Sequence, residues 1–173
     1  MVSKQRRGGS TGSELVAATL LLRGCVMSTV KSCIARKSGQ VHSLPSTSSV
    51  LEALQMMKEH RIRAVLVIDN GRLAGIISQG DCAIRVLLPG GDAGATKISE
   101  IMTRDPLTVA PVHTIDHCMK IMMSRSIRHL PVLDEGKVTG MISIGDVVKD
   151  IMQQQGELIK YLETYIKGHA VEY

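Results

Sequence analysis

The stretch GMISIGDVV, Gly140 to Val148, ends a run of apolar residues with a Ser, a Gly and an Asp. Sixty-five residues earlier the chain reads GIISQGDCA, Gly75 to Ala83. A buried strand needs apolar residues, but it does not need a Ser and an Asp three positions apart at its end. The repeated polar ending therefore indicates a duplicated unit with a purpose beyond packing.

The duplication extends well beyond these nine residues. Residues 42–81 align with residues 107–146 at a constant offset of 65, without a gap, and eleven of the 40 pairs are identical. A repeat of this length that occurs only twice favours a pair of units related by a pseudo-two-fold axis over a solenoid.

Each copy predicts an opening strand, a helix, two strands joined by a tight turn, and a closing helix. The first helix begins with a capping-box pattern, Ser49 and Glu52, and its counterpart begins with Thr114 as the cap. Asn70-Gly71 and Glu135-Gly136 interrupt paired apolar runs, as expected of hairpin turns. The predicted class is therefore α/β (α+β), with two β-α-β-β-α repeats at residues 27–92 and 93–155.

The positive charge is concentrated in the N-terminal part of the chain. The net charge is +5, but residues 1–40 hold seven Lys and Arg against one acid, and residues 41–173 are close to neutral. A basic groove for nucleic acid is therefore not expected. Residues 1–26 are interpreted as a disordered basic extension of a cytoplasmic protein, with a mitochondrial presequence or residues upstream of a start at Met27 as alternatives. No apolar run is long enough to span a membrane.

A long helix is predicted to follow Asp146 and to include a C-terminal extension, residues 156–173. Gly156 is expected to bend or break it, because glycine inside a helix costs about 1 kcal/mol. The helix is expected to pack against a second copy of the chain, with packing inside one chain as the alternative. Its apolar residues at helical spacing are Val147, Val148, Ile151, Met152, Leu158, Ile159, Leu162 and Ile166.

The Ser-x-Gly-Asp ending suits a nucleoside phosphate. Free N–H groups at a helix start attract anions, and Gly80 or Gly145 lets a ligand approach the backbone. A carboxylate can accept hydrogen bonds from two adjacent ribose hydroxyls, and the Ser hydroxyl can add one more. The alternative is that Ser and Asp only cap the helix.

The second copy is the stronger candidate for a binding site. Its segment SIRHLPV offers Arg128 for phosphate and Pro131, which has no N–H and so leaves backbone groups unpaired beside it. The first copy keeps Arg63, but Ala64 and Leu66 replace the His and the Pro.

At these residues the chain resembles the cystathionine-β-synthase (CBS) domain family. The matching pattern is Leu130-Pro131-Val132 followed by Gly-apolar-Ile-Ser-x-x-Asp, and ISEIMTRDPLTVAP, Ile98 to Pro111, resembles the start of a second CBS repeat. The resemblance implies a tandem pair, or Bateman module, whose halves pack sheet to sheet and which commonly dimerises. It implies a regulator rather than an enzyme, with no required cofactor, that binds AMP, ADP, ATP or S-adenosylmethionine and signals to a partner protein.

The resemblance also implies roles for single residues. Ribose hydroxyls would lie on Asp146 and Asp81, and Ser143 and Ser78 would contact ribose or phosphate. The remaining family positions are Thr108 and Ser43 near the base, and Arg128, His129 and Arg63 at phosphates or the base edge. Many members carry a basic residue just before the Asp, where this chain has glycine, so AMP or S-adenosylmethionine is expected at least as much as ATP.

Other groups of residues do not predict a metal site, a phosphate-binding loop or a catalytic site. His113 and His117 have no third metal ligand, and the glycines of PGGDAGATK lack the surroundings of a phosphate loop. Cys82 and Cys118 are expected in the core, and no motif places a nucleophile beside a base. The alternative function is a dimeric scaffold with vestigial clefts that regulates an enzyme, for example a redox enzyme.

Overall fold

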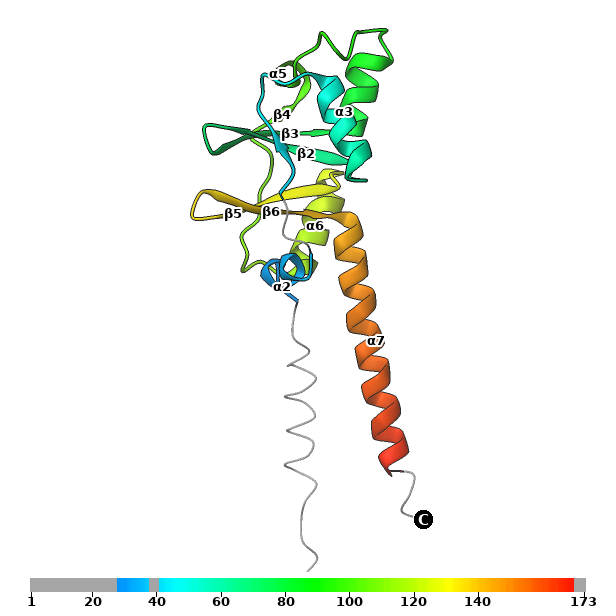
Figure 1. Ribbon diagram of the computed structural model, residues 1–173. Helices are drawn as coiled ribbons and strands as arrows, with labels where there is room; N and C mark the ends of the chain where they lie inside the picture. The colour runs from blue at the N-terminus through cyan, green and yellow to red at the C-terminus, as the bar shows by residue number, and fades with distance from the viewer. Residues whose placement is uncertain (1–27, 38–40, 170–173) are drawn as a thin grey trace, which may run out of the picture.

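The computed structural model describes residues 28–37 and 41–169. It contains two α/β halves, one per repeat, and the first half lies above the second in the view of Figure 1. The predicted basic extension, residues 1–26, lies outside the described residues. The first half contains β1 (Ser43–Leu44), α3 (Val50–Glu59), β2 (Ala64–Asp69), β3 (Arg72–Ser78), α4 (Gln79–Cys82) and the π-helical turn η1 (Ala83–Leu87). The second contains α6 (Ile115–Arg125), β5 (His129–Asp134), β6 (Lys137–Ser143) and α7 (Ile144–His169). In the sequence, α2 (Val30–Ala35) precedes the first half, and α5 (Ile98–Ile101) and β4 (Thr103–Arg104) lie between the two halves.

Both predicted hairpins are present, and β3 and β6 bring them against each other (Figure 1). At their turns Asn70 and Gly71 have φ of 51° and 76°, and Glu135 and Gly136 have 47° and 80°. Two consecutive positive φ values are the requirement of the tight turn that matches strand twist. The predicted caps are also confirmed, since Ser49 and Glu52 form a capping box and Thr114 accepts a hydrogen bond from the His117 N–H.

The opening segments of the two repeats differ. In the first, β1 runs parallel to β2, and Leu66 N–H donates to His42 O at 3.2 Å. In the second, only Val109 bridges to Val132, so the predicted opening strand is wrong there. Pro131 occupies the position of Leu66 and has no N–H to donate, which removes the hydrogen bond that begins the first strand.

Each half is completed by the segment that precedes the other repeat. Val30 and Cys33 of α2 belong to the core of the second half, whereas Ile98 and Ile101 of α5 belong to the core of the first. The backbone contacts are symmetrical, because Val30 N–H donates to His113 O and Ile98 N–H donates to Ser48 O, both at 2.8 Å. β4 adds a fourth strand beside β3, in the order β1-β2-β3-β4.

The cores are aliphatic. Cys82 lies in the first and Cys118 in the second, as predicted, and both are fully buried. Burial raises the pKa of both thiols to about 11, so they stay protonated near neutral pH and are poor nucleophiles.

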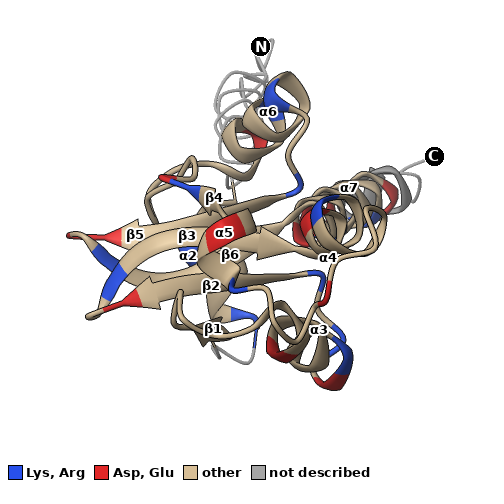
Figure 2. Ribbon diagram, turned by 90° about the horizontal axis from the view of Figure 1, so that it is seen from above, with Lys and Arg blue, Asp and Glu red and all other residues tan. Residues whose placement is uncertain are grey.

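Both closing helices lie on the same side of the sheets, but only α7 continues beyond the body of the protein (Figures 1 and 2). The break expected at Gly156 is wrong, because α7 is continuous from Ile144 to His169. Val147 is buried and Ile151 packs against the second core. Val148, Met152, Leu158, Ile159 and Leu162 are exposed. The Ile166 side chain lies outside the described part of the chain. Among the described residues no helix is both long and apolar enough to cross a membrane.

Candidate functional site

The Ser and Asp of the repeated ending contact each other in both repeats. In the second, Asp146 Oδ2 accepts from Ser143 N–H at 2.8 Å and from Ser143 Oγ at 2.6 Å, and Asp146 N–H lies 3.3 Å from Ser143 Oγ. In the first, Asp81 Oδ2 accepts from Ser78 N–H at 2.9 Å and from Ser78 Oγ at 2.6 Å. The capping role considered from the sequence is therefore present in both copies.

The second carboxylate oxygen distinguishes the repeats. Asp81 Oδ1 lies 3.8 Å from Arg85 Nε, one turn further along the closing helix. The residue at the corresponding position of α7 is Asp150, which offers no positive charge to Asp146. Every hydrogen bond that Asp146 accepts from the described residues goes to Oδ2. Its Oδ1 is therefore available to an external donor.

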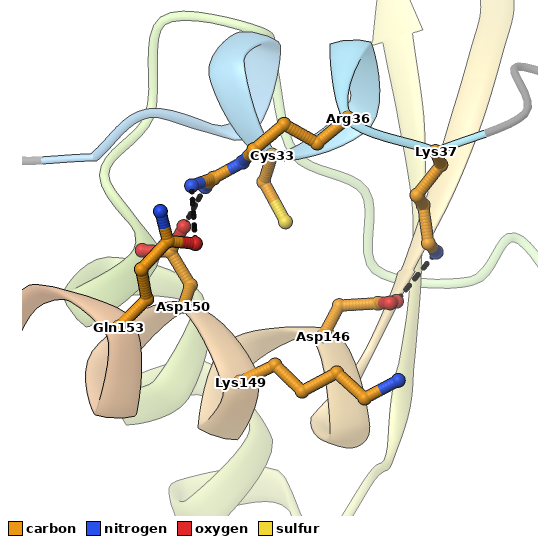
Figure 3. Close-up of a pocket in the computed structure, with 7 residues that line it drawn as sticks. All are labelled: Cys33, Arg36, Lys37, Asp146, Lys149, Asp150 and Gln153. Atoms are coloured by element: carbon orange, nitrogen blue, oxygen red, sulfur yellow. Dashed lines mark hydrogen bonds and ion pairs between the residues drawn. The ribbon is translucent and has the colours of Figure 1, made fainter.

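Lys37, two residues after α2, reaches Asp146 from outside the repeat. Its Nζ lies 2.5 Å from Asp146 Oδ2 and 3.0 Å from Met141 O (Figure 3). Burial by itself would raise the pKa of Asp146, but the hydrogen bonds from Lys37 and Ser143 and the Lys37 charge outweigh it, and the pKa is lowered. Asp146 is thus held as a carboxylate.

Asp150 is the buried charge of the second half, with 3% of the residue exposed. It pairs with Arg36, accepts a hydrogen bond from Ser28 Oγ at 2.9 Å, and accepts another from Gln154 Nε2 at 2.6 Å. Arg36 also donates to Gln153 Oε1 at 3.1 Å. This network ties the end of α2 to the first turns of α7.

Together these groups line a cavity of about 240 Å³ between α2 and α7 (Figure 3). Of its residues the sequence predicted only Asp146. The others come from α2, the two residues after it and later turns of α7, for which no short motif gave a signal: Cys33, Arg36, Lys37, Lys149, Asp150 and Gln153. With three cationic side chains and two carboxylates, the cavity can bind an anion and donate or accept hydrogen bonds.

Two further predicted residues of the second repeat, Arg128 and His129, lie at the start of β5. His129 pairs with Ser143 across the hairpin, and exposed Arg128 accepts a hydrogen bond at its carbonyl from Ile144 N–H at 2.9 Å. Burial lowers the pKa of His129, Lys37 and Arg128 lower it further, and Asp146 opposes them. His129 is therefore neutral near pH 7 and close to the cavity.

Thr108 and Pro131 lie on the neighbouring edge. Val109 N–H, next to Thr108, donates to Pro131 O at 3.0 Å, which places the opening segment beside β5. The carbonyl oxygen of Pro131 is therefore paired. What Pro131 lacks is an N–H that could donate a hydrogen bond to the opening segment.

The predicted residues of the first repeat form a similar arrangement. Ser43 pairs with Leu66 and Ser78 pairs with Ala64, so both lie at one end of the sheet. Arg63 donates to Gln79 Oε1 at 3.0 Å. Arg63 and Arg85 are thus already engaged by protein groups.

The glycines in the first turns of α4 and α7 leave space for a ligand. A Cβ at Gly80 would meet only Ser78 Oγ, at 3.6 Å, and one at Gly145 only Ser143 Oγ, at 3.7 Å. The fold therefore does not demand glycine at either position.

The described residues contain no cluster of three or more potential metal ligands. The His113 and His117 rings are 4.7 Å apart, and His113 Nδ1 accepts a hydrogen bond from Ala110 N–H. That nitrogen is thus engaged in capping a turn.

The arrangement defines a tandem pair of CBS domains. The sequence profile of the CBS domain matches residues 30–87 and 98–153, and the chain belongs to this family. The mitochondrial CBS domain-containing protein CBSX3 of Arabidopsis thaliana is 34% identical over 125 residues, which cover 69% of this chain and 61% of that protein. CBS domain-containing protein YhcV of Bacillus subtilis is 29% identical, over 75% of this chain and 89% of its own.

Solved structures of CBS-domain proteins have the same fold as this chain. A putative signal-transduction protein with CBS domains from Burkholderia ambifaria superposes with a TM-score of 0.71 at 37% identity, covering 74% of this chain and 96% of its own. The CBS domain pair of protein MJ0100, solved in complex with 5′-methylthioadenosine and S-adenosyl-L-methionine, superposes with a TM-score of 0.66 at 27% identity, covering 74% and 98%.

Proposed function

We propose that this protein is a sensor that binds an adenosine nucleotide at the second repeat and transmits its occupancy through α7. The observation that carries the proposal is the free Oδ1 of Asp146 beside a cavity with three cationic side chains. A carboxylate oxygen can accept from a ribose hydroxyl, and the cations can bind phosphate. The assignment of adenine follows the complex of MJ0100 with two adenosyl ligands.

The charges favour a nucleotide phosphate over S-adenosylmethionine. Arg36, Lys37 and Lys149 line one cavity with Asp146 and Asp150, so cations outnumber carboxylates there and a phosphate is favoured over a sulfonium cation. Glycine at position 145 removes one expected cation, but α2 and α7 supply others from outside the repeat. We therefore propose AMP or ADP as the preferred ligand.

Occupancy can reach α7 through the two consecutive cations after α2. Arg36 pairs with Asp150 of α7, and Lys37 pairs with Asp146 at the start of α7. A phosphate that draws either cation toward itself weakens an α2–α7 contact. The signal would thus be a change in how α7 is held.

Titration calorimetry of the full chain with AMP, ADP, ATP and S-adenosylmethionine tests this proposal. Asp146→Asn preserves the shape and should weaken AMP binding about 10- to 100-fold, because a charged acceptor is lost. Asp81→Asn is the matched control and should leave the affinity within about threefold of wild type, which is well under 1.4 kcal/mol.

Two results would contradict the proposal. One is the absence of binding heat with every ligand, which would support the scaffold alternative. The other is an affinity that depends on Asp81 and not on Asp146, which would move the site to the first repeat.

A further inference from the structure

The exposed face of α7 carries a seven-residue repeat that nothing in the described part of the chain covers. Val148, Met152, Ile159 and Leu162 follow the alternating four- and three-residue spacing of a coiled-coil seam, with Gln155 at the intervening position. Their exposed fractions are 43%, 67%, 56% and 45%, and Leu158 beside them is 36% exposed. The CBS profile ends at residue 153, so half of this seam lies beyond the family fold.

Gly156 is the second unusual feature of α7. A Cβ there would meet nothing within 4 Å, so no contact in the described structure requires glycine. Glycine nevertheless lies inside a continuous helix, where alanine is favoured. It lies next to Gln155, at the middle of the seam, and close approach of another helix backbone would account for it.

The charges beside the seam decide the direction of such a helix. Lys149 follows Val148 and Glu163 follows Leu162, so the two occupy equivalent flanking positions two repeats apart, and both are exposed. In a parallel pair they would lie about 21 Å apart along the axis, at 1.5 Å per residue. In an antiparallel pair centred near Gly156, Lys149 of each copy faces Glu163 of the other.

We infer that α7 pairs with α7 of a second copy of this chain in an antiparallel coiled coil that crosses at Gly156. Met152 of one copy then packs against Leu162 of the other, and Ile159 packs near Gln155. The two-fold axis generates two Lys149–Glu163 pairs and brings the two glycines together. The inference does not rest on the proposed nucleotide binding, and Lys149 belongs both to the cavity and to the flank of the seam.

Analytical ultracentrifugation of the full chain without nucleotide tests the pairing. Wild type should show a concentration-dependent dimer. Ile159→Asp should lower the association constant at least about tenfold, because it buries an unpaired charge. Thr164→Asp adds the same charge outside the seam and should leave association unchanged. Monomeric wild type would overturn the inference, and so would a dimer that survives Ile159→Asp unchanged.

The direction is tested by charge reversal. Lys149→Glu and Glu163→Lys should each weaken the dimer about fivefold, because each creates two like-charged pairs, and the double variant should restore wild-type association. Simply additive losses would contradict the antiparallel register. Gly156→Ala should also weaken the dimer while raising the helix content of the chain, and a dimer tightened by alanine would contradict the close crossing.

Discussion

The two repeats share eleven identical pairs, yet their repeated Asp residues have different surroundings. Asp81 lies beside Arg85 of its own helix, whereas Asp146 has Asp150 in that place and is reached by Lys37 from α2. The Ser-x-Gly-Asp ending has the same side chains in both repeats. One helical turn later the first repeat has Arg85 and the second has Asp150, so the two endings have opposite charges beside them. A repeat therefore specifies a scaffold, and residues outside the aligned signature specify the charges around each Asp.

The largest difference between the repeats should appear at the opening strand. Leu66→Pro removes the hydrogen bond to His42 O and the packing of a fully buried side chain, and should cost roughly 2–4 kcal/mol of unfolding free energy. Pro131→Leu restores a donor and should change stability by less than about 1 kcal/mol. Urea denaturation measures both, and equal losses would mean that the proline does not explain the missing strand.

The glycines that begin the two repeated stretches offer a second comparison. A Cβ at Gly75 would lie 2.7 Å from the Thr103 carbonyl oxygen, whereas one at Gly140 would lie 2.9 Å from Ile34 Cδ1, the end of a flexible side chain. Gly75→Ala should therefore cost about 2–3 kcal/mol and Gly140→Ala about 1 kcal/mol. Chemical denaturation gives both values, and a reversed order would contradict the packing of β4 against β3.

The charged groups on the closing helices give a smaller contrast. Arg36→Ala leaves the Asp150 carboxylate, 1% exposed, with only neutral donors, and should cost about 1–2 kcal/mol because Arg36 itself is 45% exposed. Arg85→Ala removes a 3.8 Å surface pair and should cost under about 1 kcal/mol. Thermal unfolding of the two variants measures both losses of stability. Adding Asp150→Asn should recover part of the Arg36→Ala loss, and failure to do so would show that the charge is not the cause.

The smallest effect concerns pH. Because His129 has a lowered pKa, the folded state binds fewer protons there than the unfolded state, so its contribution is present above about pH 6.5 and is lost as pH falls below it. His42 also has a pKa lowered, chiefly by burial, so His129→Gln should remove only part of the slope between pH 7 and pH 5. An unchanged slope would indicate that His129 titrates normally.

Much of the fold was predictable because its determinants are local. The hairpin turns follow from Asn70-Gly71 and Glu135-Gly136, the caps follow from Ser49 and Thr114, and the duplication follows from a constant offset. The second opening strand was predicted wrongly, because the proline that removes its donor lies more than 20 residues away in sequence. The break at Gly156 was also predicted wrongly, since one glycine does not offset a helix of 26 residues.

The sequence by itself determined that there are two CBS repeats and that each ends in a Ser–Asp pair, because backbone propensity and side-chain identity at fixed spacing set these features. Only the tertiary structure decided which cations surround Asp146. That depends on α2 crossing to the second core, which carries Arg36 and Lys37 to residues more than 100 positions away. Burial of Val30 and Cys33 drives that crossing, and it is a property of the assembled core that no short segment encodes.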